Sequence, residues 1–296
     1  CNNATFTVNA TAPAVGTGVW SIVSGSPTIT NPNSFNTTVT GVPLGTSATL
    51  RWTVSNGSCA SNSDDVVLTN DNNPTPTLSS SDGDNTICAG ESVTFTAGGG
   101  TNYEFFVNGS SVQNGASTTY TTSALLNGQV VSVAVRNAAG CTVVSSGITT
   151  TVNPIPVATI VSNDADNIVC AGSSVTFTAS PAGATNYIFR VNGGNVQNAA
   201  SRVYTTTTLA DGDVVDVIVT SASGCAGTSA GITMDVDAAP NAADAGVDII
   251  QCNNPSFTMA ANNAVAGTTG SWSVVSGTAT ITTANSPTTT ITGVTA

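Results

Sequence analysis

The chain has 296 residues, a formal net charge of −12 and only 7% charged residues, with four arginines, no lysine and no histidine. Nucleic-acid binding needs basic side chains to neutralise phosphates, so this balance excludes it and also excludes an anionic membrane surface as a partner. No apolar run approaches the ~18 residues of a membrane span, so we expect no membrane insertion.

The sequence gives little support to catalysis. Without histidine or lysine, neither a Ser-His nor a Ser-Lys arrangement can form. The acidic residues fall in turn-like segments, and none lies in an apolar setting that would raise its pKa for acid catalysis. We therefore expect a protein that is not an enzyme and that has no catalytic residues.

Residues 1–43 resemble residues 252–295: CNNATFTVNA corresponds to CNNPSFTMAA, and WSIVSG to WSVVSG. Between these copies, CAGESVTFTA (88–97) returns as CAGSSVTFTA (170–179), and TNY and VQN follow both. Repetition at a period in the eighties predicts tandem domains. We predict type A domains at 1–72 (first strand missing) and 238–296 (truncated), and type B domains at 73–153 and 154–237.

Type A contains ATFTVNA, ATLRWTV and DVVLT, which alternate apolar and polar residues as half-buried strands do. Trp20 and Trp52 alternate with polar neighbours, and we expect both to fill a core. The alternative is that one of them is an exposed tryptophan on which a carbohydrate stacks.

Short proline-containing segments separate the predicted domains: NNPTPT (72–77), NPIP (153–156) and DAAP (237–240). Proline fixes φ and disfavours helix before it, so these linkers should be extended and stiff. We expect the domains to follow one another end to end.

Type B predicts seven short strands: an opening strand, SVTFTA, NYEFFV, SSVQ, TTYTTSAL, VVSVAV and VVSSGITTTV. Asn108-Gly109 and Asn127-Gly128 are hairpin signals, because both residue types tolerate positive φ. This pattern predicts an all-β chain, a tandem array of immunoglobulin-like β-sandwich domains. Tyr120 and Tyr204 should be core or corner residues.

Each domain has cysteines before the second strand and after the sixth, and their spacing contains no CxxC pair of the kind that zinc sites use. The seven cysteines are Cys1, Cys59, Cys88, Cys141, Cys170, Cys225 and Cys252. Disulfides in an oxidising, extracellular compartment are the preferred interpretation.

Pairing within domains would give Cys1–Cys59, Cys88–Cys141 and Cys170–Cys225, with the partner of Cys252 outside the fragment. Alternating strands, however, would place the two cysteines of a domain at opposite ends of the sandwich, too far apart for a bond. Bridges between neighbouring domains, such as Cys1–Cys141 and Cys88–Cys225, are therefore the alternative.

Two Asp-x-Asp-Asn segments near the domain starts carry hard oxygen ligands of the kind that calcium binds. Their carboxylates are Asp82, Asp84, Asp164 and Asp166. They predict a possible structural calcium ion, with solvated turn carboxylates as the alternative. Asp211 and Asp213, in DGD, should form a hairpin turn.

Type B, with ICAGESVTFTA, TNYEFFVNG and VSVAVRNAAGC, resembles the immunoglobulin-like repeats of giant Bacteroidetes cell-surface adhesins. Type A, with WS.VSG.ATIT and LRWTVSNGSC, resembles the PKD-like or immunoglobulin-like repeats of the same proteins. The resemblance implies substrates of the type IX secretion system, including gliding-motility adhesins of the SprB kind. The matching residues are scaffold residues, so no ligand-binding residue follows from it.

Composition and resemblance together favour the structural stalk of an extracellular adhesin or filament, located at the cell surface. Its partners would be neighbouring repeats of the same chain, with self-association into fibres as a variant and an undefined surface or glycan target. The alternative is a glycan-binding accessory module of a secreted hydrolase.

Overall fold

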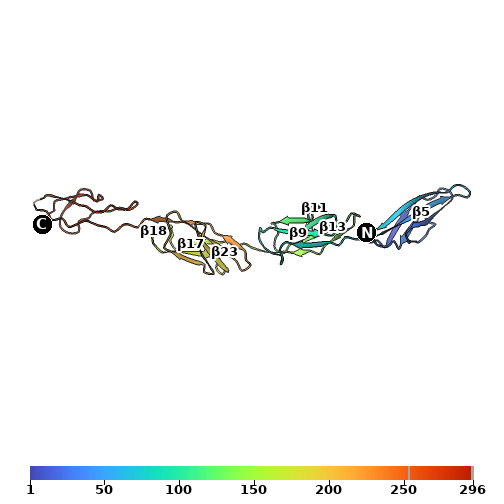
Figure 1. Cartoon of the computed structure of the whole chain (residues 1–296), viewed down its shortest axis with the longest axis horizontal. Coiled ribbons are helices and arrows are strands. Elements are labelled where there is room, and N and C mark those ends of the chain that lie inside the picture. Colours follow the sequence, from blue (N-terminus) through green and yellow to red (C-terminus); the bar gives the residue numbers. More distant parts are fainter. Residues whose placement is uncertain (253, 295–296) are drawn as a thin grey trace. The chain divides into compact units, whose positions relative to one another are not determined.

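A computed structural model describes residues 1–252 and 254–294, in which every regular element is a β-strand (Figure 1). The chain divides into two compact units, Cys1–Asn153 and Pro154–Ala296. Three separate hydrophobic cores lie within them. The chain is thus an all-β tandem array of sandwiches, as its repeats predict.

The first sandwich pairs a sheet of order β1-β4-β3 with a sheet of order β2-β5-β6. Its strands are β1 (Thr5–Asn9), β2 (Thr17–Ser24), β3 (Thr28–Ile29), β4 (Asn36–Thr40), β5 (Thr46–Ser55) and β6 (Asn62–Asn70). The side chains of β5 alternate between the two faces of its sheet: Leu50 and Trp52 point into the core, and Arg51 between them is exposed.

Trp20 and Trp52 lie directly opposite each other on β2 and β5, with ring centroids 5.1 Å apart. Only 5% and 7% of their surfaces are exposed, so both are core residues, as predicted. Gly18 makes room for this packing, because a Cβ there would clash with the indole of Trp52.

The second sandwich has sheets of order β12-β9-β7 and β11-β10-β13-β14, with β15 also paired to β13, and a parallel pair β16-β8. Its strands are β7 (Thr77–Ser80), β8 (Thr86–Cys88), β9 (Val93–Gly98), β10 (Asn102–Val107), β11 (Ser110–Gly115), β12 (Thr119–Thr122), β13 (Val130–Arg136), β14 (Thr142–Val144), β15 (Ile148–Thr149) and β16 (Thr151–Asn153).

The third sandwich repeats this topology strand for strand, with sheets β17-β19-β22, β21-β20-β23-β24 (β25 on β23) and the parallel pair β18-β26. Its strands are β17 (Thr159–Ser162), β18 (Ile168–Cys170), β19 (Val175–Ser180), β20 (Asn186–Val191), β21 (Gly194–Ala199), β22 (Val203–Thr206), β23 (Val214–Thr220), β24 (Ala226–Thr228), β25 (Ile232–Thr233) and β26 (Asp235–Asp237). In the fourth segment (238–296), β27 (Ser256–Thr258), β29 (Thr290–Thr292) and β28 (Thr280–Ile281) form one sheet.

The repeated VTFTA motif supplies the centre of the second and third cores. Its phenylalanines, Phe95 and Phe177, are fully buried. Tyr120 and Tyr204 are half-buried and pack against these cores, as expected. Tyr204 lies with its ring centroid 5.5 Å from that of Phe189.

The Asn-Gly predictions had different outcomes. Asn108 and Gly109 both have positive φ, at 47° and 79°, and join β10 to β11 in a tight hairpin as predicted. Asn127-Gly128 is different, because it connects strands of two different sheets. The hairpin prediction is wrong there, and equally for Asp211–Asp213 between β22 and β23, since a sequence pair specifies a turn but not whether the chain changes sheet.

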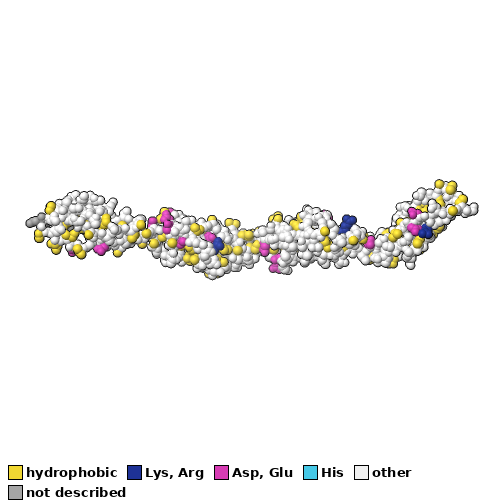
Figure 2. Space-filling model, turned by 45° about the horizontal axis from the view of Figure 1, so that its top comes forward, with side chains coloured by type: hydrophobic (Ala, Val, Ile, Leu, Met, Phe, Trp, Pro, Cys, Tyr) yellow, Lys and Arg dark blue, Asp and Glu magenta, His cyan; other side chains and the backbone are white. Residues whose placement is uncertain are grey.

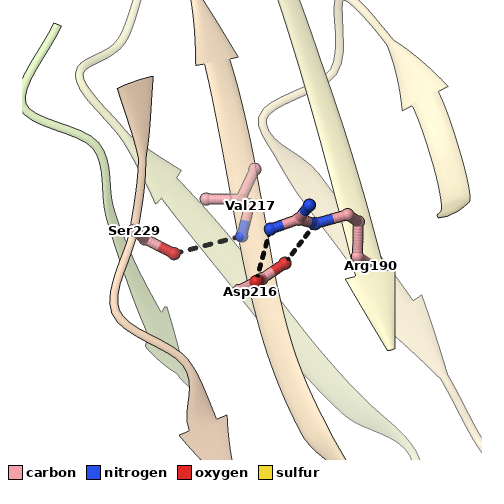
Figure 3. A network of polar contacts seen from close by, with 4 residues as sticks. All are labelled: Arg190, Asp216, Val217 and Ser229. Atoms are coloured by element: carbon pink, nitrogen blue, oxygen red, sulfur yellow. Dashed lines mark hydrogen bonds and ion pairs between the residues drawn. The ribbon is translucent and has the colours of Figure 1, made fainter. Parts of the chain in front are cut away.

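The predicted opening and closing strands of type B are each interrupted. The opening strand splits into β7 and β8 and the closing strand into β14, β15 and β16, so that β8 and β16 pair in parallel at one end. Where the closing strand is interrupted, a serine side chain accepts a backbone hydrogen bond from the neighbouring strand. The Val133 amide donates to Ser145 Oγ at 3.1 Å, and the Val217 amide donates to Ser229 Oγ at 3.0 Å (Figure 3).

Uncharged polar side chains and backbone prevail on the face that Figure 2 shows, with few basic side chains. Arg190 on β20 lies opposite Asp216 on β23 (Figure 3). Its Nε and Nη2 donate to the two carboxylate oxygens at 2.7 and 2.6 Å. The hydrogen bond with Asp216 raises the pKa of the Arg190 guanidinium.

Changing Asp216 to alanine should destabilise the third sandwich by about 1 kcal/mol, because it leaves a half-buried guanidinium without its bidentate partner. The second sandwich has Phe106 and Ser132 at the corresponding cross-strand positions. The double change Arg190→Phe with Asp216→Ser should therefore cost less than Asp216→Ala alone. Urea unfolding measures both, and equal losses would contradict the argument.

Candidate functional site at the junction of the first and second sandwiches

The most distinctive group of hydrogen bonds in the first unit, together with a disulfide, lies where the first sandwich ends and the second begins. The chain start is fastened to the end of β6: the Asn2 amide donates to the Asp71 carbonyl at 2.9 Å, and the Asn3 amide donates to Asn70 Oδ1 at 2.8 Å. Asn70 is itself buried and donates from Nδ2 to the Val42 carbonyl. Cys1 is thereby held where the chain leaves the first sandwich.

The second sandwich presents a tight turn, 137–141, between β13 and β14. Gly140 has a φ of 87°, and its amide donates to the Asn137 carbonyl at 3.0 Å. The Asn137 side chain accepts from the Cys141 amide at 2.9 Å and donates to the Asn72 carbonyl in the linker at 2.7 Å. One asparagine therefore ties this turn to the linker.

Cys1 and Cys141 are joined by a disulfide with a Cα–Cα distance of 5.5 Å, across 140 positions of sequence. The predicted pairs Cys1–Cys59 and Cys88–Cys141 are therefore wrong, and the alternative Cys1–Cys141 is confirmed. The physical reason is strand direction, because alternating strands place the two cysteines of one sandwich at opposite ends.

The remaining cysteines divide into bonded and free ones. Cys88 and Cys225 are disulfide-bonded. Cys59, Cys170 and Cys252 are exposed free thiols, so the predicted Cys170–Cys225 bond is absent. Disulfides of this kind indicate folding in an oxidising compartment outside the cytosol.

The linker is also fixed by a glycine. Gly99, after β9, has a φ of 98°, and a Cβ added to it would clash with the Thr75 carbonyl. Only glycine allows the linker backbone to lie this close to the second sandwich. No sequence signal distinguished Asn137 or Gly99 as junction residues, since their partners lie in the linker.

The predicted calcium carboxylates lie in tight turns and accept backbone hydrogen bonds. Asp82 and Asp84 both accept from the Thr86 amide, at 2.8 and 2.9 Å. A side-chain hydrogen bond with Asp164, followed by one from the Ile168 amide, lowers the pKa of Asp166. Within residues 1–252 and 254–294, no group of three or more His, Cys, Asp or Glu side chains is placed to hold a metal ion.

A surface cavity of about 670 Å³ opens on the first sandwich beside its tryptophans. Its walls include Trp20, Trp52, Asn62 and Asp64. The Nε1 of Trp52 is buried and has no hydrogen-bond partner among the described residues, whereas the Nε1 of Trp20 donates to the Ser34 carbonyl at 3.1 Å. Asp64 lies opposite Trp52 in the sheet register.

Comparisons with known proteins find no matching family model and no matching curated protein. Solved structures do match. Fibronectin(III)-like modules of CbhA from Clostridium thermocellum align over 55% of this chain and 95% of theirs, at 14% identity and a TM-score of 0.33. The ectodomain of mouse nectin-like molecule 4 aligns over 79% and 94%, at 9% identity and a TM-score of 0.30. Murine CEACAM1b aligns over 55% and 100%, at 9% identity and a TM-score of 0.29.

The sandwich fold of this chain follows from its own sheets and hydrophobic cores. No helix among the described residues is long and apolar enough to cross a membrane.

Proposed function

We propose that this chain is part of the non-enzymatic stalk of a giant cell-surface adhesin or filament, located outside the cell. The observation that carries the proposal is the Cys1–Cys141 disulfide, which adds a second covalent connection to the linker between two successive sandwiches. An array whose task is to project a distal region and to bear tension benefits from junctions that resist bending and separation.

Three further features agree with this role. The linkers are short and contain proline, the repeated residues are core and turn residues, and the sequence has no histidine or lysine for catalysis. The resemblance to Bacteroidetes surface repeats extends the proposal to adhesins exported by the type IX secretion system, including gliding adhesins. The partners would be neighbouring repeats, self-associated copies in a fibre, and a surface or glycan target.

Electron microscopy of the purified chain tests the stalk. We expect extended, beaded particles whose angle between the first two beads is narrowly distributed. In Cys1→Ser the beads should persist while that angular distribution broadens, because only the linker and its hydrogen bonds remain. A compact globule, or equal distributions in both proteins, would count against the proposal.

Glycan binding is the second candidate function, and the cavity beside Trp20 and Trp52 is the observation that favours it. Asp64 and Asn62 can accept hydrogen bonds from sugar hydroxyls. Tryptophan fluorescence titrated with a panel of neutral oligosaccharides discriminates the two roles. A saturable change that Asp64→Asn abolishes, while Asp211→Asn in the third sandwich preserves it, would favour the binding module.

We also propose that Asp164 and Asp166 bind a structural calcium ion that stiffens the third sandwich. One observation supports it: Oδ1 of Asp164 is buried with no hydrogen-bond partner among the described residues. With the 10⁻⁴–10⁻³ M affinity of extracellular calcium modules, 10 mM calcium should add about 1–3 kcal/mol to the free energy of unfolding. Calorimetry should show this gain lost in Asp164→Asn and kept in Asp211→Asn; an unchanged melting temperature with calcium would refute the site.

A further inference from the structure

The chain contains five Asn-Gly pairs, and the asparagine of each is exposed. An Asn-Gly pair is reactive, because glycine has no side chain to shield its backbone nitrogen from the carboxamide carbon of the asparagine before it. That nitrogen can attack the carbon and close a five-membered ring, so the surrounding structure decides which pairs react. The pairs are Asn56-Gly57, Asn108-Gly109, Asn114-Gly115, Asn127-Gly128 and Asn192-Gly193.

Two of these asparagines begin the hairpin turns of the second and third sandwiches, and each is held by two hydrogen bonds. The Asn108 amide donates to the Val130 carbonyl at 2.9 Å, and Asn108 Oδ1 accepts from the Val130 amide at 2.9 Å. Asn192 forms the same two bonds with Val214, at 2.8 and 3.0 Å. In both turns the carboxamide must give up a hydrogen bond before it can swing toward the glycine nitrogen.

Two further pairs are restrained in other ways. Asn127 Oδ1 accepts from the Val152 amide at 3.0 Å. The attacking nitrogen of this pair is also engaged, because the Gly128 amide donates to the Thr150 carbonyl at 2.9 Å. Asn114-Gly115 lies within β11, where pairing with β10 holds the backbone extended. A paired strand resists the backbone rotation that ring closure requires.

Asn56-Gly57, in the turn between β5 and β6, has none of these restraints. The Asn56 carbonyl accepts from the Cys59 amide at 3.1 Å. Within residues 1–252 and 254–294, however, neither the Asn56 carboxamide nor the Gly57 amide forms a hydrogen bond. No part of the chain beyond its neighbours comes within 4 Å of where a Cβ on Gly57 would lie. Both reacting groups are therefore free to meet.

We propose that Asn56-Gly57 is a self-modification site, at which Asn56 is converted to aspartate and isoaspartate while the other four pairs persist in the folded protein. The Gly57 nitrogen, after giving its proton to hydroxide, forms a bond to Cγ of Asn56. The bond from Cγ to Nδ2 breaks and the nitrogen leaves as ammonia. Water then opens the succinimide at either of its carbonyls. In balance, one asparagine and one water give one acidic residue and one ammonia.

The modification changes both the charge and the backbone of this turn. Either product adds one negative charge to a chain whose formal net charge is already −12. In isoaspartate the main chain passes through Cβ and Cγ, and the former Asn56 carbonyl, which accepts from the Cys59 amide, becomes a free carboxylate. The turn should therefore differ between newly made and aged molecules, whether or not the chain is a stalk.

The test compares two identical tripeptides in one chain, because Asn56 and Asn108 are both followed by Gly-Ser. Purified protein is incubated at mildly alkaline pH, digested at acidic pH and analysed by mass spectrometry with fragmentation that distinguishes isoaspartate. In the folded protein we expect Asn56 to be converted about tenfold faster than Asn108, because a hydrogen bond must break only at Asn108. In concentrated urea with a reductant the two rates should converge.

Equal conversion of Asn56 and Asn108 in the folded protein would overturn the inference, and so would an Asn56 that persists there. A ratio that stays the same in urea would assign the difference to sequence and would also overturn it. Asn56→Asp provides the reference: the faster product of the parent should elute with it on anion exchange. Circular dichroism of Asn56→Asp checks that the first sandwich stays folded after conversion.

Discussion

Replacing Cys1 with serine in the intact chain should lower the free energy of unfolding of the first unit by about 3–5 kcal/mol. The disulfide spans 140 positions, and closing a loop of that length removes much of the conformational entropy of the unfolded chain. Cys1 is the better position to change, because Cys141 is buried and its thiol can remain as a small apolar group.

Denaturant unfolding followed by fluorescence measures this loss, since two of the three tryptophans lie in the first sandwich. Cys59→Ser is the matched control: Cys59 is exposed and free, so its variant should unfold like the parent. Equal stability of Cys1→Ser and the parent would mean that the bond adds nothing to the linker.

Phe177→Ala should destabilise the third sandwich by about 3–5 kcal/mol, because the ring is fully buried at the centre of its core and its removal leaves a cavity. Since a small domain is stable by only about 5–15 kcal/mol, this sandwich should become marginal. The separate cores predict that the first two sandwiches keep their own transitions.

Differential scanning calorimetry resolves these transitions. Val161→Ala is the control, because Val161 lies on β17, paired with the strand of Phe177, but is 60% exposed. It should shift the transition by less than a quarter of the effect of Phe177→Ala. A uniform downward shift of all transitions in Phe177→Ala would show that the sandwiches do not unfold independently.

Structural features that depend only on neighbouring residues could be predicted from the sequence. Alternation placed β1, β5 and β6, the tryptophan cores and the VTFTA strands correctly, because side-chain period and burial are linked along a single strand. The Asn108-Gly109 hairpin could also be predicted from the sequence, since its two positive φ values lie within the dipeptide.

Features that depend on topology could not be predicted from the local sequence pattern. Spacing of about 55 residues suggested bonds within domains, but strand direction places Cys1 beside the following sandwich. The parallel β8–β16 pair and the sheet change at Asn127-Gly128 likewise depend on which strands meet in space. For the cysteines, counting strand directions was the signal that indicated the alternative.

The bond between Cys1 and Cys141 also sets the path of mechanical load. Tension applied at Cys1 is transmitted through the two sulfur atoms to Cys141. The first sandwich, β1 to β6, therefore lies in a covalent loop that this tension bypasses. If that sandwich unfolds under tension, the molecule does not lengthen. Its residues can each add up to ~3.3–3.6 Å of reach only after a reductant cuts the bond. Reduction of the disulfide, and not force alone, would then allow the unfolded first sandwich to lengthen the molecule.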